Sequence, residues 1–229
     1  MTPLCIIPAR GGSKRLPHKN RLPLAGRPMI EYSIDCALAS GLFERVIVAT
    51  DQAEIARIAE RSGVALYHEP EEMAGDLVGT DQVSLAVLLD REAKGDSHES
   101  VVCLQPSSPL RSVSDLAGSW ARFVESGADF LVSVTAIDPH YFHWALHHEG
   151  GGWKMVFGDT YATVERPLLP PVYRPNGSIK MAKSEALKVT GHFFGSPLDV
   201  FETPEDRSVH VATPFDFSLA EHLLARRTE

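Results

Sequence analysis

Short apolar runs alternate with amphipathic segments over the first half of the chain. The runs at residues 4–7, 46–49, 64–67, 101–104 and 130–134 predict buried strands, because polar or turn-forming residues bound each of them. Apolar side chains at helical spacing predict helices over residues 28–41, 51–63, 83–87 and 114–124. Strands and helices that alternate in this way form right-handed βαβ units and a mostly parallel sheet.

Residues 138–173 break this alternation. Histidines, aromatic residues, prolines and the turn Gly150-Gly151-Gly152 fall there, and they predict a hairpin that leaves the main sheet. Strands at residues 178–182 and 208–212 and a helix over residues 214–226, with Phe215 on its expected core face, complete the pattern. A chain of 229 residues fits one α/β domain, residues 1–229, of the three-layer Rossmann-like type with a small arm.

Composition narrows the class of protein. The formal net charge of −8 argues against nucleic acid as a main partner. No apolar run approaches the roughly 18 residues of a membrane span. The N-terminus has no signal-peptide pattern, so we expect a cytoplasmic location and no membrane partner. Cys5, Cys36 and Cys103 follow neither metal nor disulfide spacing, which predicts buried free thiols.

Positive charge is concentrated at the start of this acidic chain. The first thirty residues contain no Asp or Glu, yet they carry Arg10, Lys14, Arg15 and Lys19 around Gly11-Gly12-Ser13. Backbone N–H groups in such a turn form an anion-binding concavity, and the cations add charge-assisted hydrogen bonds. The segment matches neither the P-loop nor the dinucleotide-binding pattern. A polyphosphate site and a solvated basic loop both fit these residue types.

Three polar segments directly follow predicted strands. They are the basic loop, Thr50-Asp51 and Gln105-Pro106. The carboxyl ends of parallel strands meet at one edge of a sheet, and ligands of α/β proteins gather there. The sequence therefore predicts a nucleotide site at this edge.

The opening segment, residues 6–20, resembles the N-terminal signature of the acylneuraminate cytidylyltransferases, the CMP-sialic acid synthetase family. Similar motifs follow in order at Thr50-Asp51, at residues 104–111 (Leu-Gln-Pro-Ser-Ser-Pro-Leu-Arg), at residues 174–177 (Arg-Pro-Asn-Gly) and at residues 192–194 (His-Phe-Phe). The resemblance implies a nucleotidyltransferase fold. It also implies attack by the anomeric hydroxyl of a nonulosonic acid on the α-phosphate of CTP, which releases pyrophosphate. It further implies a homodimer, with residues 138–173 as the dimerisation arm.

The resemblance assigns roles residue by residue. Arg10 and Lys19 match the family's catalytic cations, which neutralise charge around phosphorus. The implied nucleotide-binding residues are Ala9, Arg10, Gly11, Gly12, Ser13, Lys14, Lys19, Asn20 and Thr80. The implied sugar-binding residues are Gln105, Arg166, Arg174, Asn176, Phe193 and Phe194, with Arg166 assigned to the neighbouring subunit's site. Residue types alone leave other roles open. Thr80 could be a helix N-cap, Gln105 an ordinary loop residue, and Phe193 and Phe194 core aromatic residues.

Some positions depart from the family pattern. Relatives often carry a basic residue near position 69 and a tyrosine at position 180, where this chain has Glu69 and Lys180. The family's pair of Mg²⁺-binding aspartates corresponds here to His210 and Ala212. Asp216 is nearby, but residues 213–216 (Thr-Pro-Phe-Asp) are typical of a helix start with the aspartate in the first turn. We therefore expect Mg²⁺ to be held weakly, through the CTP phosphates and water.

Other functions stay open at this point. An eight-carbon octulosonate (KDO-type) cytidylyltransferase is the nearest alternative, and a nucleotide-sugar-binding regulator without turnover fits the altered metal positions. A flavodoxin-like binding domain explains the alternation of elements but not the basic opening. His140, His143, His147 and His148 suggest a metal site, since His143 and His147 are four residues apart. With no H-E-x-x-H motif, solvated or interfacial histidines are the favoured interpretation.

Overall fold

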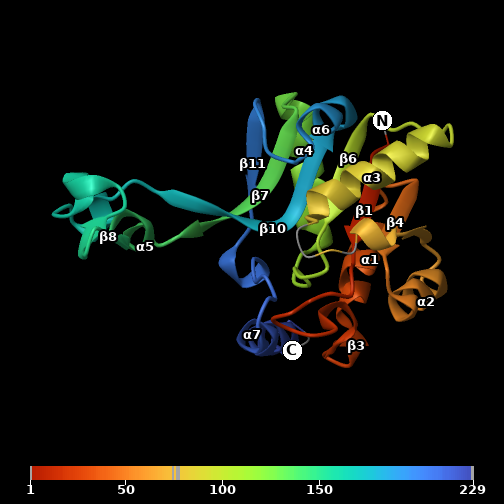
Figure 1. Ribbon diagram of the computed structural model, residues 1–229, viewed down its shortest axis with the longest axis horizontal. Coiled ribbons are helices and arrows are strands. Elements are labelled where there is room, and N and C mark those ends of the chain that lie inside the picture. The colour runs from red at the N-terminus through yellow and green to blue at the C-terminus, as the bar shows by residue number, and fades with distance from the viewer. Residues whose placement is uncertain (1, 74, 76–77, 228–229) are drawn as a thin grey trace.

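The computed structural model describes residues 2–73, 75 and 78–227 (Figure 1). The opening hairpin of β2 (Pro23–Leu24) and β3 (Arg27–Pro28) leads into α1. The helices are α1 (Met29–Ser40), α2 (Ala53–Arg61), α3 (Thr80–Ala93), α4 (Val113–Ser126), α5 (Pro139–His143), α6 (Ser184–Thr190) and α7 (Pro214–Ala225). The other strands are β1 (Leu4–Pro8), β4 (Arg45–Thr50), β5 (Ala65–His68), β6 (Ser100–Leu104), β7 (Phe130–Ile137), β8 (Leu146–Glu149), β9 (Gly152–Met155), β10 (Val172–Lys183) and β11 (Leu198–Glu202).

The central sheet confirms the mostly parallel arrangement. Within the described residues its strand order is β11-β7-β10-β6-β1-β4-β5. The pairs β1–β4, β1–β6, β4–β5 and β7–β11 are parallel, while β10 runs antiparallel to both β6 and β7. Every residue of β6 is buried, as its uncharged sequence predicts for a central strand.

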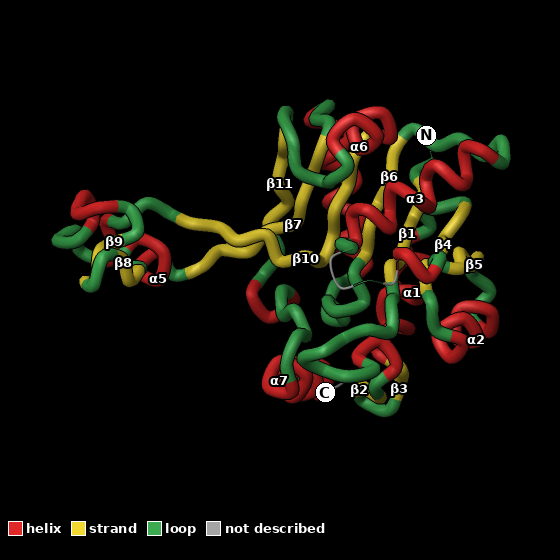
Figure 2. The backbone as a smooth tube through the Cα atoms, viewed as in Figure 1, coloured by secondary structure: helices red, strands yellow, loops and turns green. Residues whose placement is uncertain are grey.

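Helices cover both faces of this sheet. One apolar cluster joins α1, α2 and α4 to one face, and a second joins α3 and α6 to the other. This confirms the three-layer architecture, whose strands lie side by side in Figure 2. Cys5, Cys36 and Cys103 are free and buried, as expected, and burial raises the pKa of each thiol. Of the helices described, none has the length and apolar character needed to cross a membrane.

An arm projects from the sheet at the predicted place. Strands β7 and β10 continue beyond the main body, still paired as far as Ile137 and Val172, and carry a lobe that contains α5, β8 and β9 (Figures 1 and 2). Strands β8 and β9 form the predicted hairpin. Gly150 and Gly151 make its turn with φ values of 60° and 82°, which glycine adopts without steric cost.

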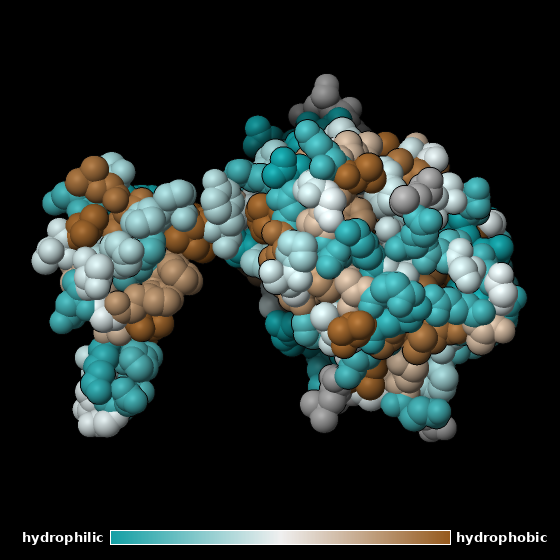
Figure 3. Space-filling view, turned by 90° about the horizontal axis from the view of Figure 1, so that it is seen from above, coloured by the Kyte–Doolittle hydropathy of each residue, from teal (hydrophilic) through white to brown (hydrophobic). Residues whose placement is uncertain are grey.

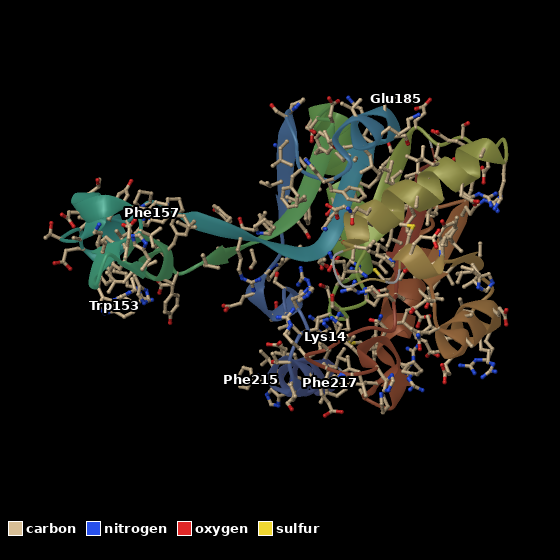
Figure 4. The ribbon with its side chains drawn as sticks, viewed as in Figure 1. Lys14, Trp153, Phe157, Glu185, Phe215 and Phe217 are labelled. Carbon is tan, nitrogen blue, oxygen red and sulfur yellow. The ribbon has the colours of Figure 1, made fainter. Side chains whose placement is uncertain are left out.

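Two expectations for the last quarter of the chain are wrong. Residues 208–212 form no ladder with a described strand, although Val211 N–H donates to the Ser107 carbonyl at 2.7 Å. The edge strand is β11 instead, paired with β7. Phe215 is 76% exposed, while Phe217 and Ala220 pack the inner side of α7. Figure 4 shows both phenylalanines on this helix.

Candidate functional site

The basic loop is fixed where β1 and β4 end. The Thr50 hydroxyl donates to the Ala9 carbonyl at 2.8 Å, and the Asp51 carboxylate accepts the Gly11 N–H at 2.8 Å. Ala9 is buried in the core, and the Gly11 N–H is already used. These two predicted nucleotide-binding residues therefore shape the loop.

A cavity of about 640 Å³ opens at this edge of the sheet. Its wall brings together most of the predicted nucleotide-binding residues and one predicted sugar-binding residue from the ends of β1 and β6 and the start of α3. They are Arg10, Gly12, Ser13, Lys14, Lys19, Asn20, Thr80 and Gln105. Arg15, Glu69, Ser107 and His210 line the same cavity. Lys14 is labelled in Figure 4, between α7 and the central sheet.

Arg10 and Asn20 brace the cavity wall. The Arg10 guanidinium donates from Nη1 to the carbonyls of Gly75 at 2.8 Å and Val78 at 3.1 Å. The Asn20 amide donates to the Arg10 carbonyl at 3.1 Å, and its side chain is buried. The guanidinium thus links the basic loop to the segment before α3.

Lys19 is a partly buried cation on the cavity wall. Its ammonium donates to the Val211 carbonyl at 3.0 Å. Burial, helped by the positive charges of Arg15 and Arg10, lowers the Lys19 pKa to about 8, and Asp216 opposes this shift. A bound polyphosphate would bring negative charge to this cluster of cations.

Gln105 and Thr80 meet on the wall of the same cavity. The Gln105 amide donates to the Thr80 hydroxyl at 3.4 Å and accepts from the Ser107 hydroxyl at 3.4 Å. Gly79, not Thr80, is the N-cap of α3, so Thr80 is not the helix cap that its residue type also allowed. Lys180 donates to the Thr80 hydroxyl at 3.3 Å and pairs with Asp81 at 2.7 Å.

Arg174 lies in a neighbouring cavity of about 510 Å³. His210 lines both cavities and stands between Arg174 and the basic loop. Gly177 has a φ of 71°, and a Cβ there would lie 3.4 Å from both Gln105 Oε1 and His210 Nδ1. Glycine at this position therefore allows β10 to pass close behind the cavity wall.

Several predicted sugar-binding residues lie away from the main cavity. The Asn176 amide is buried and bonded to the hydroxyls of Ser133, Thr203 and Ser208, so it ties β10 to β7 and to the segment after β11. Phe193 is fully buried in the core, which supports the core-aromatic alternative, and Phe194 is 38% exposed. Arg166 is on the arm, paired with Asp138. Among the described residues, the cavity wall includes none of these predicted four.

The residues present do not form a carboxylate site for Mg²⁺. His210 Nδ1 lies 3.3 Å from the Ser107 hydroxyl, and burial together with Lys19 and Arg15 lowers its pKa to about 4. Ala212 has no ligand atom in its side chain. Asp216 Oδ2 accepts from the backbone N–H groups of Ala212 and Thr213 and from the Thr213 hydroxyl, which confirms its role in the helix start. In the described part of the chain, no three His, Cys, Asp or Glu side chains group as metal ligands.

His143 and His147 do not share a helix, although their spacing of four residues allowed it. His143 ends α5 and bonds the Pro170 carbonyl at 3.1 Å, whereas His147 lies in β8. His140 contacts Asp138, and His148 packs against Trp153. His147 and His148 are exposed, as expected for solvated histidines, whereas His143 is buried and departs from that expectation.

Glu69 also lines this cavity, although the sequence analysis noted it only as a departure from the family pattern. Glu69 directly follows β5, and its N–H donates to the Thr50 carbonyl at 3.0 Å. Strand β5 is parallel to β4, so the rule that located Thr50-Asp51 also applies to the residue after β5.

Comparisons with known proteins agree with this geometry. The profile of the cytidylyltransferase family matches residues 4–167. An N-acylneuraminate cytidylyltransferase of Streptococcus agalactiae serotype V is 33% identical over 221 residues, which are 95% of this chain and 52% of that protein. This chain thus spans about half the length of that relative and of its counterparts from two other serotypes. A pseudaminic acid cytidylyltransferase of Campylobacter jejuni is 27% identical, and the match covers 97% of this chain and 96% of the relative.

Among solved structures, the fold is similar to that of a CMP:2-keto-3-deoxy-manno-octonic acid synthetase complexed with CTP. The TM-score is 0.75, with 99% of this chain and 100% of that chain covered. The sequence identity is 17%, so this likeness bears on the fold alone.

Proposed function

This chain belongs to the cytidylyltransferase family, and we propose that it joins CMP from CTP to the anomeric hydroxyl of a nonulosonic acid of the sialic, legionaminic or pseudaminic type. The observation that carries the proposal is the single cavity that connects the cations of the basic loop to Gln105. The cations suit a triphosphate, and an amide held between Thr80 and Ser107 suits an oriented polar contact to a sugar acid.

In the proposed reaction the anomeric oxygen forms a bond to the α-phosphorus. The bond from this phosphorus to the bridging oxygen breaks, pyrophosphate leaves, and the hydroxyl proton passes to solvent. Lys19 and Arg10 stabilise the charge that builds up on the phosphate oxygens. Gln105, with Arg174 beyond His210, is assigned to the sugar acid, and the Arg174 guanidinium fits its carboxylate.

Mg²⁺ is proposed to arrive with CTP, held by the phosphates and water. His210 and Ala212 have no carboxylate oxygen, and the Asp216 carboxylate uses Oδ2 to accept hydrogen bonds at the start of α7. The use of CTP, a metabolite of the cytoplasm, supports a cytoplasmic location.

Pyrophosphate release tests this function directly. The protein is incubated with CTP, Mg²⁺ and a panel of 2-keto sugar acids with eight or nine carbons, and released pyrophosphate is measured. We expect release with a nine-carbon acid. Release with only the eight-carbon acid would favour the octulosonate enzyme, and CTP binding without release for any acid would favour the regulator.

We also propose that the arm builds a homodimer. Tyr141, Trp153 and Leu168 on the arm are 72%, 70% and 75% exposed. Figure 3 shows apolar residues gathered on this lobe, and Figure 4 labels Trp153 and Phe157 there. A patch of this kind on a monomer marks a surface that another protein covers. The assignment of Arg166 to the partner's site depends on this dimer.

Sedimentation checks the dimer. We expect a species of about twice the 25.1 kDa mass of the chain at micromolar concentration. Trp153→Glu should shift it towards the monomer, because a charge then enters the apolar interface. Val189→Glu is the matched control, since Val189 is 86% exposed on α6, outside the arm. A wild-type species of 25.1 kDa would contradict the proposal.

A further inference from the structure

Glu69 carries an unpaired carboxyl group on the wall of the nucleotide cavity. The residue is only 7% exposed. Neither carboxyl oxygen has a hydrogen-bond partner among the described residues. Buried polar groups are almost always hydrogen-bonded, because an unsatisfied one keeps its full desolvation cost. A ligand that offers polar atoms to this carboxyl would therefore offset the desolvation cost that the free protein carries.

The surroundings of Glu69 favour its neutral form. Burial and the nearby Asp51 carboxylate raise its pKa to about 7, and Arg10 acts in the opposite direction. At neutral pH much of the population is then protonated. A protonated carboxyl presents an O–H donor beside a carbonyl acceptor, whereas the ionised form presents acceptors only.

We propose that the Glu69 carboxyl reads the cytosine ring of bound CTP, donating to ring N3 and accepting from the 4-amino group. This inference rests on the proposed function. On cytosine the acceptor N3 and the donor 4-amino group lie side by side on one edge of the ring. An acidic side chain is the usual acceptor for this amino group. Uracil has a carbonyl in place of the amino group and a hydrogen on N3. Because cytosine N3 is the more basic acceptor, the neutral carboxyl binds cytosine more tightly than uracil.

The ribose is the competing contact for this carboxyl, and its pH dependence has the opposite sign. The 2′- and 3′-hydroxyls would donate two hydrogen bonds, which suits an ionised carboxylate. A contact to ribose therefore strengthens as the pH rises through about 7, the pKa of Glu69. A contact to cytosine N3 weakens over the same range, because ionisation removes the donor and sets the carboxylate against the N3 lone pair.

Nucleotide binding without a sugar acid tests the inference. The dissociation constants of CTP, UTP and dCTP are measured by calorimetry between about pH 6 and about pH 8.5, at constant Mg²⁺. The two nucleotides share the same triphosphate. The ratio of the UTP dissociation constant to that of CTP, the UTP/CTP ratio, is therefore independent of the triphosphate contacts and of the protonation of Lys19. We expect the wild-type ratio to fall several-fold as the pH rises, and Glu69→Ala to lower it about tenfold at pH 6. Glu69→Gln, whose amide also offers a donor and an acceptor, should give a ratio independent of pH.

Glu72→Gln is the matched control, since Glu72 is exposed on the 3-10 turn Glu71–Met73, and it should behave as the wild type. A wild-type ratio that does not change with pH, or a change confined to the dCTP/CTP ratio, would overturn the assignment to cytosine. If pyrophosphate release is seen alongside either result, the proposed function stands and only this inference fails. Failure of all three nucleotides to bind would overturn both.

Discussion

Lys19→Ala is expected to slow pyrophosphate release by about two orders of magnitude or more, with the fold retained. The Lys19 ammonium is held at the cavity wall by the Val211 carbonyl, with the cations Arg10 and Arg15 nearby. A preorganised charge in a partly desolvated site stabilises the transition state more than the ground state, and its loss costs about this much in kcat. Single-turnover kinetics with saturating CTP measures the effect.

The matched control is Lys188→Ala. Lys188 lies on α6 and pairs with Glu92 and Glu185, away from the cavity. Its removal should leave turnover unchanged. Turnover like that of the wild type in a folded Lys19→Ala protein would remove the basic loop from the mechanism.

The pH dependence supplies a second test of Lys19. Its pKa of about 8 means that the free protein loses this charge as the pH rises through that value. We therefore expect kcat/KM for CTP to fall above about pH 8, because this ratio reports the free enzyme. Lys19→Arg keeps the positive charge at higher pH, so the fall in kcat/KM above about pH 8 should disappear in this variant. Glu69 is the same in both proteins, so the difference between them isolates Lys19.

The basic loop was predictable because two independent physical rules pointed to one place. Cations without nearby acids predict an anion site, and the carboxyl ends of parallel strands predict where ligands lie. Asp51 and Gln105 obey the second rule, and so does Glu69 after β5. The sequence analysis noted Glu69 only as a departure from the family pattern.

The roles of Asn176 and Phe193 could not be read from the sequence. A polar amide beside an arginine looks the same whether it faces a ligand or the core. The difference depends on Ser133, Thr203 and Ser208, which are close to Asn176 only after β7, β10 and β11 have assembled. In the same way, Phe193 becomes a core residue through its packing with α3 and α6.

Residues 208–212 show how far a local pattern reaches. The alternation of apolar and polar residues in this segment agrees with its side-chain directions, since Val211 is fully buried while His210 lines the cavity. It could not predict a strand, because a strand also requires a partner along its length. The segment makes a backbone hydrogen bond to Ser107, and β11 is the strand that pairs with β7. The direction of a side chain depends on neighbouring residues in the chain. The pairing of a strand depends on the whole sheet.

The same alternation leads to the prediction for the metal. His210 and Ala212 flank the buried Val211, and side chains on either side of a residue in an extended segment point away from it. Aspartates at both positions would present two carboxylates to one ion, which Mg²⁺ accepts readily. We expect His210→Asp with Ala212→Asp to lower the magnesium concentration for half-maximal pyrophosphate release by about tenfold, since Mg²⁺ would no longer be held by phosphates and water alone.

The control must separate charge from shape, because the double substitution also removes the contact between His210 and Ser107. His210→Asn with Ala212→Asn has nearly the same size and no charge, and its magnesium dependence should match the wild type. Thermal unfolding without CTP gives a readout independent of turnover: only the aspartate variant should gain stability as Mg²⁺ is added, because a ligand stabilises the state that binds it. Equal magnesium dependence in the aspartate and asparagine variants would mean that the segment before α7 does not face the metal.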